Sequence, residues 1–290
     1  MKFPQFQYVK PRSLDEALAL LAAANGTATP IAGGQSLLAG LSMRIATPAS
    51  LVDLGALAEL KGITFADDAQ SLRIGAMTRH ADMLASPLVR QHVPLLHEAV
   101  QLVGHVAIRN RGTLGGSLAY ADPAAELPAC AVALGATLTL VGLGGQRSVE
   151  AADFFRGFLE TALEPGELIV DVRFPVAAAG QLSAILEFSR RTGDFAQAGL
   201  AVVARATQGM LDTPRFVYFG CVDRARLATR VNGVLAGAGF PVKKPAGLAA
   251  AVDADIEPSD SPGCRADTKA KWAQVLTGRV IDVLNQRAVA

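Results

Sequence analysis

The sequence has few cysteines and few charged side chains for its length. Three cysteines occur in 290 residues, at positions 130, 221 and 264, and none of them belongs to a CxxC pair. Few and widely spaced cysteines exclude a disulfide framework and argue against a zinc or iron–sulfur site in this chain. Charged residues make up only 18% of the chain, with a formal net charge of +1. Such a chain has no electrostatic footprint for nucleic acid or for an anionic membrane surface.

Apolar residues are abundant instead, at 51% of the chain. This content excludes disorder, and the length suits one large or two modest domains. No charged residue falls between Glu126 and Arg147. The prolines, glycines and threonines of that stretch favour a buried helix at 124–135 and a buried strand at 137–143 over a membrane span. The first eight residues lack the apolar core of a secretory signal, so we expect a cytoplasmic protein without a transmembrane segment.

Short-range patterns predict mixed helices and strands in the first 176 residues. The capping-box pattern Ser13–Glu16, followed by leucines at helical spacing, predicts a helix over about 13–24. Asp122 and the following Pro123 predict the N-cap and first turn of the helix at 124–135. Further helices are predicted from residue 78 and over about 94–103, and strands at 29–32, 50–54, 71–74 and 168–174.

The composition changes at a segment rich in Pro, Ala, Gly and Gln, residues 175–183, which we expect to be a linker. Strands and helices beyond it indicate a second, small α+β domain. The expected elements are strands at 199–204 and 215–222, helices over about 225–237 and 267–286, and a loop at 253–264. The predicted domains are 1–176, with parts of about 1–56 and 57–176, and 183–287.

Two glycine-rich segments carry the chemical information. Ala32–Ser36 directly follows a predicted strand, and Thr113–Ser117 follows the basic stretch Ile108–Gly112. Paired glycines let a ligand approach the backbone, and successive free N–H groups form an anion site suited to a phosphate. Neither segment matches GxGxxG or GxxxxGK[ST], so a Rossmann or P-loop site is not indicated. From the residues alone, each segment could also be an ordinary turn.

Both segments, with the following Ala121–Glu126, resemble the paired flavin-binding motifs of the FAD-containing medium subunit of molybdenum hydroxylases. That family includes xanthine, aldehyde, carbon monoxide and aromatic N-heterocycle dehydrogenases. The resemblance covers about residues 1–285 and includes Ser50–Asp53, Ile74–Thr78 and Arg190–Ala196. It implies an α+β chain: a vanillyl-alcohol-oxidase-type (PCMH-type) FAD-binding domain of two α/β subdomains, then a C-terminal α+β domain with a small antiparallel sheet and helices.

The resemblance also implies which residues contact a non-covalently bound FAD. Asp122 and Glu126 lie where relatives place an acidic contact to the ribose or adenine, although Asp122 could equally be a helix N-cap and Glu126 a solvated first-turn residue. Ile169 matches an apolar position at the adenine end, with ordinary core packing as its alternative. Val103 falls near a position against the flavin. The residues implied to enclose the diphosphate are Pro30, Ile31, Ala32, Gly33, Gly34, Gln35, Ser36 and Leu37, and Thr113, Leu114, Gly115, Gly116 and Ser117.

Glu187 departs from the family pattern. Many relatives carry a lysine at about this position, near the pyrimidine edge of the flavin, where a cation would stabilise negative charge on the reduced ring. Either Arg190 or Arg191 takes over that role, or the correspondence shifts by one or two residues. Tyr120 stands where histidine is frequent, either stacking on a ring or half-buried with a satisfied hydroxyl. The histidines at 80, 92, 97 and 105 form neither a triad nor a metal set, and His105 is the one that could approach FAD.

The resemblance implies an oxidoreductase subunit with no catalytic or metal-binding residues of its own. Substrate would be oxidised at a molybdenum cofactor in a large partner subunit. Electrons would pass through two [2Fe–2S] clusters in a small partner subunit to this FAD and then to an external acceptor. Such clusters need about eight cysteines, which this chain lacks. A dimer of heterotrimers is one assembly that the resemblance raises. The alternative is a stand-alone flavin oxidoreductase, for which no acid–base constellation is visible.

Overall fold

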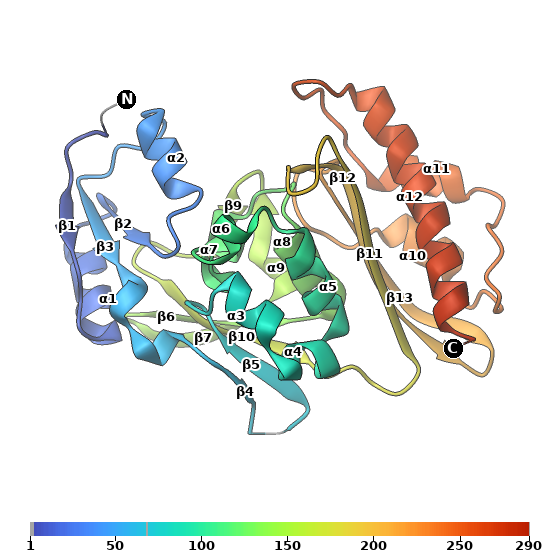
Figure 1. Ribbon diagram of the computed structural model, residues 1–290, viewed down its shortest axis with the longest axis horizontal. Coiled ribbons are helices and arrows are strands. Elements are labelled where there is room, and N and C mark those ends of the chain that lie inside the picture. The colour runs from blue at the N-terminus through green and yellow to red at the C-terminus, as the bar shows by residue number, and fades with distance from the viewer. Residues whose placement is uncertain (1–2, 68, 290) are drawn as a thin grey trace.

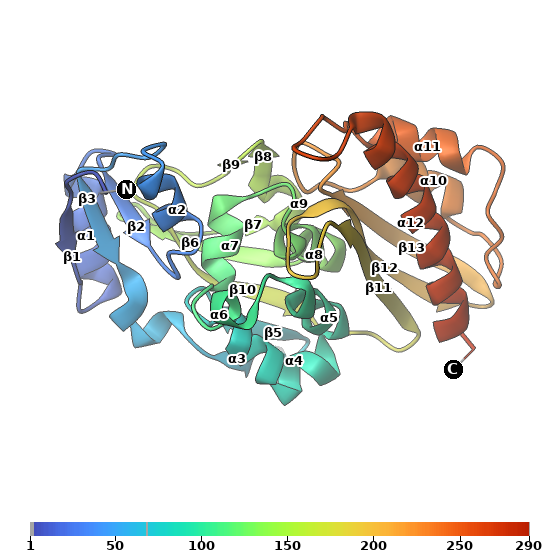
Figure 2. The ribbon, with the colours of Figure 1, turned by 45° about the horizontal axis from the view of Figure 1, so that its top comes forward.

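Three sheets follow one another along the long axis of the protein in a computed structural model that describes residues 3–67 and 69–289 (Figure 1). The N-terminal sheet lies at one end, a larger sheet with its helices lies in the middle, and the C-terminal sheet lies at the other end. The second view shows the same succession, with α7 and α8 between the two outer sheets (Figure 2).

The N-terminal sheet is parallel, with the strand order β1-β3-β2. Its strands can be parallel because a helix crosses between them each time the chain returns. The predicted cap is confirmed, since Ser13 Oγ accepts the N–H of Glu16 at 3.2 Å at the start of α1. The elements are β1 (Gln7–Val9), α1 (Leu14–Ala23), β2 (Ala28–Ile31), α2 (Leu37–Ser42) and β3 (Ser50–Asp53), followed by the 3-10 turns Leu54–Ala56 and Ala58–Leu60.

The middle sheet is antiparallel and has the strand order β4-β5-β10-β6-β7. The strand predicted at 168–174 is its central strand, which explains why Val172 and Phe174 are fully buried. The tight β8–β9 pair lies outside this sheet. The strands are β4 (Ile63–Phe65), β5 (Ser71–Gly75), β6 (Thr137–Gly142), β7 (Gly145–Glu150), β8 (Phe155–Gly157), β9 (Glu160–Thr161) and β10 (Leu168–Pro175).

All nine residues of α8 (Glu126–Leu134) are buried. This helix packs between the middle and C-terminal sheets, so the stretch without charges is an internal helix and strand. Within the described residues no helix is long and apolar enough to cross a membrane. The N-cap predicted at Asp122 is wrong, because the helix begins at Glu126 and Asp122 Oδ1 instead accepts the N–H of Ala124 at 2.9 Å in the preceding turn.

The other helices of the middle part lie around α8 and over the sheet (Figure 1). The second glycine segment is not the predicted loop, since Leu114–Tyr120 is helix α7 with Thr113 as its N-cap. A threonine before an apolar run predicts such a cap, and here it outweighs the low helix propensity of two glycines. The remaining helices are α3 (His80–Ala85), α4 (Pro87–His92), α5 (Pro94–Leu102), α6 (Val106–Arg109) and α9 (Ala151–Phe154).

The C-terminal sheet is antiparallel, with the order β11-β12-β13. It packs on α5 and α8 through one face and on α12 through the other. Its first strand begins at Gln181, so the predicted linker is shorter than expected, and α11 occupies part of a stretch where no helix was predicted. The elements are β11 (Gln181–Ser189), β12 (Ala196–Thr207), β13 (Met210–Phe219), α10 (Thr229–Leu235), α11 (Leu248–Asp255) and α12 (Ala266–Arg287).

One arginine of the C-terminal sheet reaches the end of α8. Arg215 on β13 donates from Nε to the carbonyl of Ala133 at 2.8 Å and from Nη2 to that of Val132 at 2.6 Å. These carbonyls belong to the last turn of the helix, where only that of Val132 has a further donor, the N–H of Gly135 at 3.1 Å. The C-terminal sheet therefore caps the end of α8 and fixes its position.

Candidate functional site

A cavity of about 500 Å³ lies where the three parts of the chain meet. Its walls come from residues 29–37, from the segment 76–126, from 163–169 and from the β11–β12 connection at 193–195. All but three of the eighteen predicted contact residues line it, the exceptions being Ile31, Leu114 and Glu187. Most residues that the sequence predicted to contact FAD therefore share one cavity. Their contact with FAD remains a prediction.

The first glycine segment offers a row of unused backbone donors. Among the described residues, no acceptor lies within hydrogen-bond reach of the N–H groups of Gly33, Gly34, Gln35 and Ser36. Gly34 has φ +72°, a left-handed conformation that glycine adopts without strain. Successive N–H groups around such a residue form a concave anion site. This segment therefore has the donors that the sequence predicted for a phosphate.

The second glycine segment does not offer such donors. Leu114 and Gly115 donate to the carbonyls of Thr78 and Ala76 at 3.0 and 2.8 Å, and Gly116 donates to the side chain of Thr113 at 3.2 Å. Ser117 completes the turn by donating to the Thr113 carbonyl at 3.1 Å. The interpretation of this segment as a second set of free N–H groups is wrong. Its role is to build the cavity wall.

Close backbone packing explains the glycines at two positions. A Cβ on Gly33 would lie 2.3 Å from the carbonyl oxygen of Arg111, and one on Gly115 would lie 2.6 Å from the Cβ of Ala76. Real Cβ atoms do not approach other atoms so closely, so a side chain at either position would force the segments apart. The absent side chains thus let the first glycine segment lie against Arg111 and let α7 lie against Ala76.

The charges on the cavity wall are all acidic. Within the described residues no lysine or arginine lines the cavity, whereas Asp122, Glu126, Glu167 and Asp194 do. Glu167 forms a two-pronged ion pair with Arg147 at 2.7 Å, which lowers the pKa of its carboxyl through hydrogen bonding. An anionic group in this cavity would therefore rely on backbone N–H groups and on the hydroxyls of Ser36 and Ser117.

Two of these carboxyls are held away from water. Glu126 is 7% exposed, and its burial raises its pKa to about 8, with a further contribution from the nearby Glu187. Burial likewise raises the pKa of Asp122. At neutral pH Glu126 is therefore protonated and can donate a hydrogen bond to a ligand. The alternative of a solvated first-turn glutamate does not hold.

Glu187 lies on β11, outside the cavity wall. Its Oε2 is buried without a hydrogen-bond partner in the described part of the chain, and burial raises its pKa to about 7. Arg190 forms an ion pair at 3.3 Å with Asp194, one of the carboxylates on the cavity wall. Neither Arg190 nor Arg191 lines the cavity itself. Among the described residues, no cation therefore lies on the wall where the family resemblance led us to expect one.

Other predicted residues take mixed positions. Val103 and Ile169 line the cavity, and Ile169 is 6% exposed, so it belongs to the core and to the wall at once. Tyr120 also lines the cavity and is 40% exposed. His105 does not line it and lies against Gly193 instead.

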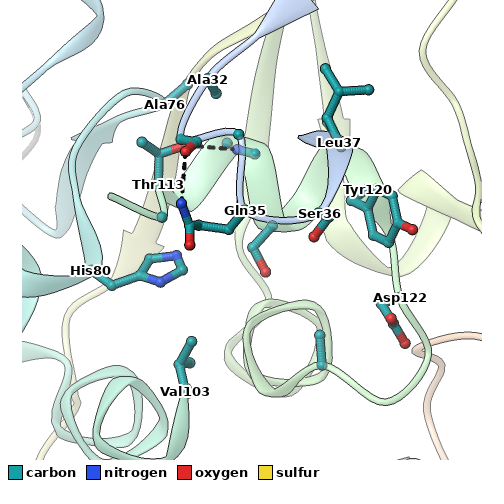
Figure 3. A pocket seen from close by; sticks show the side chains of 18 of the residues that line it. Ala32, Gln35, Ser36, Leu37, Ala76, His80, Val103, Thr113, Tyr120 and Asp122 are labelled. Atoms are coloured by element: carbon teal, nitrogen blue, oxygen red, sulfur yellow. Dashed lines mark hydrogen bonds between the residues drawn. The ribbon is translucent and has the colours of Figure 1, made fainter. Parts of the chain in front are cut away.

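His80 is a wall residue to which the sequence assigned no role. It is the first residue of α3, is 4% exposed, and lines the cavity together with Gln35 and Val103. Figure 3 shows His80 and Val103 on one side of the pocket and Tyr120 and Asp122 on the other, with Gln35 and Ser36 between them. The sequence offered one indication of a role for His80, because this residue lies just after Ile74–Thr78, a segment that resembles the family.

The geometry fits a large phosphate-bearing ligand, and comparisons with known proteins define the class as flavoproteins with a PCMH-type FAD-binding domain. The FAD-binding domain of molybdopterin dehydrogenases matches residues 4–177, and the C-terminal domain of CO dehydrogenase flavoproteins matches residues 183–284. The chain belongs to the FAD subunits of the molybdenum hydroxylases. The predicted family and fold class are confirmed.

Individual relatives extend over nearly the whole chain. The carbon monoxide dehydrogenase medium chain of Hydrogenophaga pseudoflava is 36% identical over 279 residues, 96% of each chain. The solved carbon monoxide dehydrogenase of that organism superposes with a TM-score of 0.93 over 99% of both chains, at 36% identity. Quinoline 2-oxidoreductase of Pseudomonas putida 86 superposes with a TM-score of 0.91 over 100% of both chains, at 38% identity.

Proposed function

We propose that this chain binds FAD non-covalently across the cavity and serves as the electron-transfer subunit of a molybdenum hydroxylase. The observation that carries the proposal is the row of four free N–H groups at 33–36 on a cavity without lysine or arginine among its described lining residues. Such donors fit a diphosphate, and the cavity volume of about 500 Å³ lies in the range of cofactor sites.

The chain's own residues divide the task of holding the cofactor. Gly33–Ser36 bind the diphosphate, and the hydroxyls of Ser36 and Ser117 add neutral donors. Asp122 and Glu126 contact the ribose or adenine, and Ile169 and Val103 supply apolar contacts to the two ring systems. The bound flavin supplies the redox chemistry by accepting and passing on electrons, and the protein orients it and shields it from water.

The proposal assigns the other cofactors to other chains. Cys130, Cys221 and Cys264 are buried and separate, and the described residues contain no group of three or more metal-ligating side chains. A molybdenum cofactor in a large subunit and two [2Fe–2S] clusters in a small subunit would deliver the electrons, in a heterotrimer or a dimer of heterotrimers. The similarity to a medium chain, that of the carbon monoxide dehydrogenase of Hydrogenophaga pseudoflava, supports such an assembly.

The same proposal includes the domain division. Residues 1–176 form the FAD-binding domain, with subdomains at about 1–56 and 57–176, and residues 183–287 form the C-terminal flavoprotein domain. The hydrophobic core around α12, which lies wholly within residues 182–284, supports the C-terminal domain. The core around α8 also takes in residues of that domain, such as Ala201 and Val217, so the two domains share an apolar interface.

The experiment is an absorption spectrum of the purified full chain before and after acid precipitation. We expect flavin bands that move into the supernatant, and FAD as the released species. A colourless protein that does not take up added FAD would contradict the proposal, and flavin retained in the pellet would contradict non-covalent binding. Copurification with a molybdenum-containing and an iron–sulfur subunit would separate an electron-transfer subunit from a stand-alone flavin oxidoreductase.

A further inference from the structure

His80 presents a histidine side chain that the folded chain itself leaves without partners. Neither Nδ1 nor Nε2 makes a hydrogen bond within the described residues, although the side chain is buried. A buried donor or acceptor left unsatisfied is costly, and native proteins rarely keep one without a ligand or ordered water. Because His80 lines the cavity, the group that fills the cavity can supply the missing partner.

The backbone around His80 is held rigidly against the second glycine segment. The N–H of His80 donates to the carbonyl of Gly112 at 3.0 Å, and Arg79 bridges to Thr113. Leu114 donates to the Thr78 carbonyl at 3.0 Å on the other side of the bridge. This short ladder fixes the start of α3, so the imidazole is positioned before any ligand arrives.

Space for the imidazole is also built into the chain. A Cβ on Gly112 would lie 2.9 Å from both Cε1 and Nδ1 of His80. Any other residue at 112 would therefore push the ring out of its position. The absence of a side chain at Gly112 thus leaves room for the His80 ring. A buried ring that has room but no hydrogen bond is more typical of a ligand contact than of a structural residue.

The charge state of the ring indicates the kind of partner. Burial lowers the pKa of His80 to about 4. The Thr113 backbone opposes this shift, and the positive charge of Arg109 acts in the same direction as burial. The ring is therefore neutral at physiological pH and carries one donor and one acceptor nitrogen. A phosphate oxygen offers acceptors only, whereas the ribityl–flavin half and the adenosine half of FAD both offer donors and acceptors, so the place of His80 in the pocket decides between these halves.

We propose that His80 is a positioning residue that hydrogen-bonds the ribityl–flavin half of FAD. This inference rests on the proposed function of the cavity. Its place beside Val103, across the pocket from Asp122, is consistent with that half of the cofactor (Figure 3). The diphosphate remains with the free N–H groups of Gly33–Ser36.

The test compares the affinities of the full-length apoprotein for FAD and for ADP, which shares only the adenosine diphosphate half. Replacing His80→Phe removes both hydrogen-bonding nitrogens, and we expect the Kd for FAD to rise about 10- to 100-fold while the Kd for ADP changes less than about twofold. His80→Gln restores a neutral donor and acceptor and should recover most of the affinity. His92→Phe is the matched control, since His92 does not line the cavity and should leave both constants unchanged.

Two further readouts keep the inference testable if His80→Phe folds poorly. Between about pH 5.5 and 8 the Kd for FAD should vary with pH in parallel for wild type and His80→Gln. A neutral His80 ring does not titrate there, and Glu126 and Glu187, whose pKa values of about 8 and 7 fall in this range, are present in both proteins. The apoprotein of His80→Gln should melt within a few degrees of wild type. The inference fails if His80→Phe binds FAD like wild type, if ADP weakens in parallel, or if wild type shows a change of affinity near pH 6.5 that His80→Gln lacks. If the wild type binds ADP but not FAD, or neither, the proposed function itself fails and this inference falls with it.

Discussion

Glu126 should make the stability of this protein depend on pH in an unusual direction. Its carboxyl pKa is raised from 4.5 to about 8 by burial. Between these values the folded chain keeps a proton that the unfolded chain has released, so stability falls as the pH rises. The contribution of the protonated Glu126 to the free energy of unfolding is fully present below about pH 4.5 and is lost by about pH 8. At about 1.4 kcal/mol for each pKa unit, the difference across this window is roughly 5 kcal/mol.

The substitution Glu126→Gln removes the titration but keeps the size and the polarity of the side chain. At pH 5 the variant and wild type should be equally stable, within about 1 kcal/mol. At pH 8.5 the variant should be more stable by several kcal/mol. Urea unfolding of the FAD-free chain at half-unit steps from pH 5 to 9, followed by far-UV circular dichroism, measures both.

The control for this experiment is Glu164→Gln, which makes the same chemical change at an exposed glutamate. It should leave the pH dependence of wild type intact. Glu187→Gln should remove a smaller part of the slope, because burial raises the pKa of Glu187 to about 7. Parallel pH profiles for wild type and Glu126→Gln would refute the assignment of a buried, protonated glutamate at the start of α8.

Two other substitutions test how the cavity and the domains are built. Gly33→Ala would place a Cβ 2.3 Å from the Arg111 carbonyl oxygen, so we expect at least a tenfold loss of FAD affinity by titration, whereas Gly40→Ala, with open space around its Cβ, should bind FAD normally. Arg215→Met leaves the carbonyl of Ala133 without its donor and that of Val132 with only the N–H of Gly135, and it should lower the unfolding free energy by about 1–3 kcal/mol in urea. An unchanged urea midpoint for Arg215→Met would show that solvent replaces the arginine at no cost.

The sequence predicted those features that depend on neighbours along the chain. Ser13 caps α1 as expected, and the strand at 168–174 is correct because the alternation of residue types along this segment is typical of a strand. The N-cap at Asp122 failed because aspartate followed by proline also suits a turn, and the turn shifted the helix start to Glu126. Only the fold shows that α8 lies between two sheets and therefore needs no polar face.

The same distinction applies to the site. Sequence reasoning found the two glycine segments but gave both the same role. Which N–H groups are free depends on the carbonyls of Ala76 and Thr78, which reach the second segment from about 40 residues earlier in the sequence. His80 was missed for a related reason. Its significance comes from the absence of partners around a buried ring, and no spacing pattern within one sequence can report an absence of partners in space.

The high content of apolar residues and the low content of charged residues have a structural explanation in the way the cavity is built. The N-terminal sheet, the helices around α8 and the β11–β12 connection all contribute walls to one cavity, so much of the interior is shared between parts of the chain. A cofactor in that position would contact all three parts at once. Because burial raises the pKa values of Asp122 and Glu126 and keeps His80 neutral, the cavity can hold a large ligand through uncharged hydrogen bonds. Binding through backbone groups and neutral side chains requires no lysine or arginine on the cavity wall, and none lines it among the described residues.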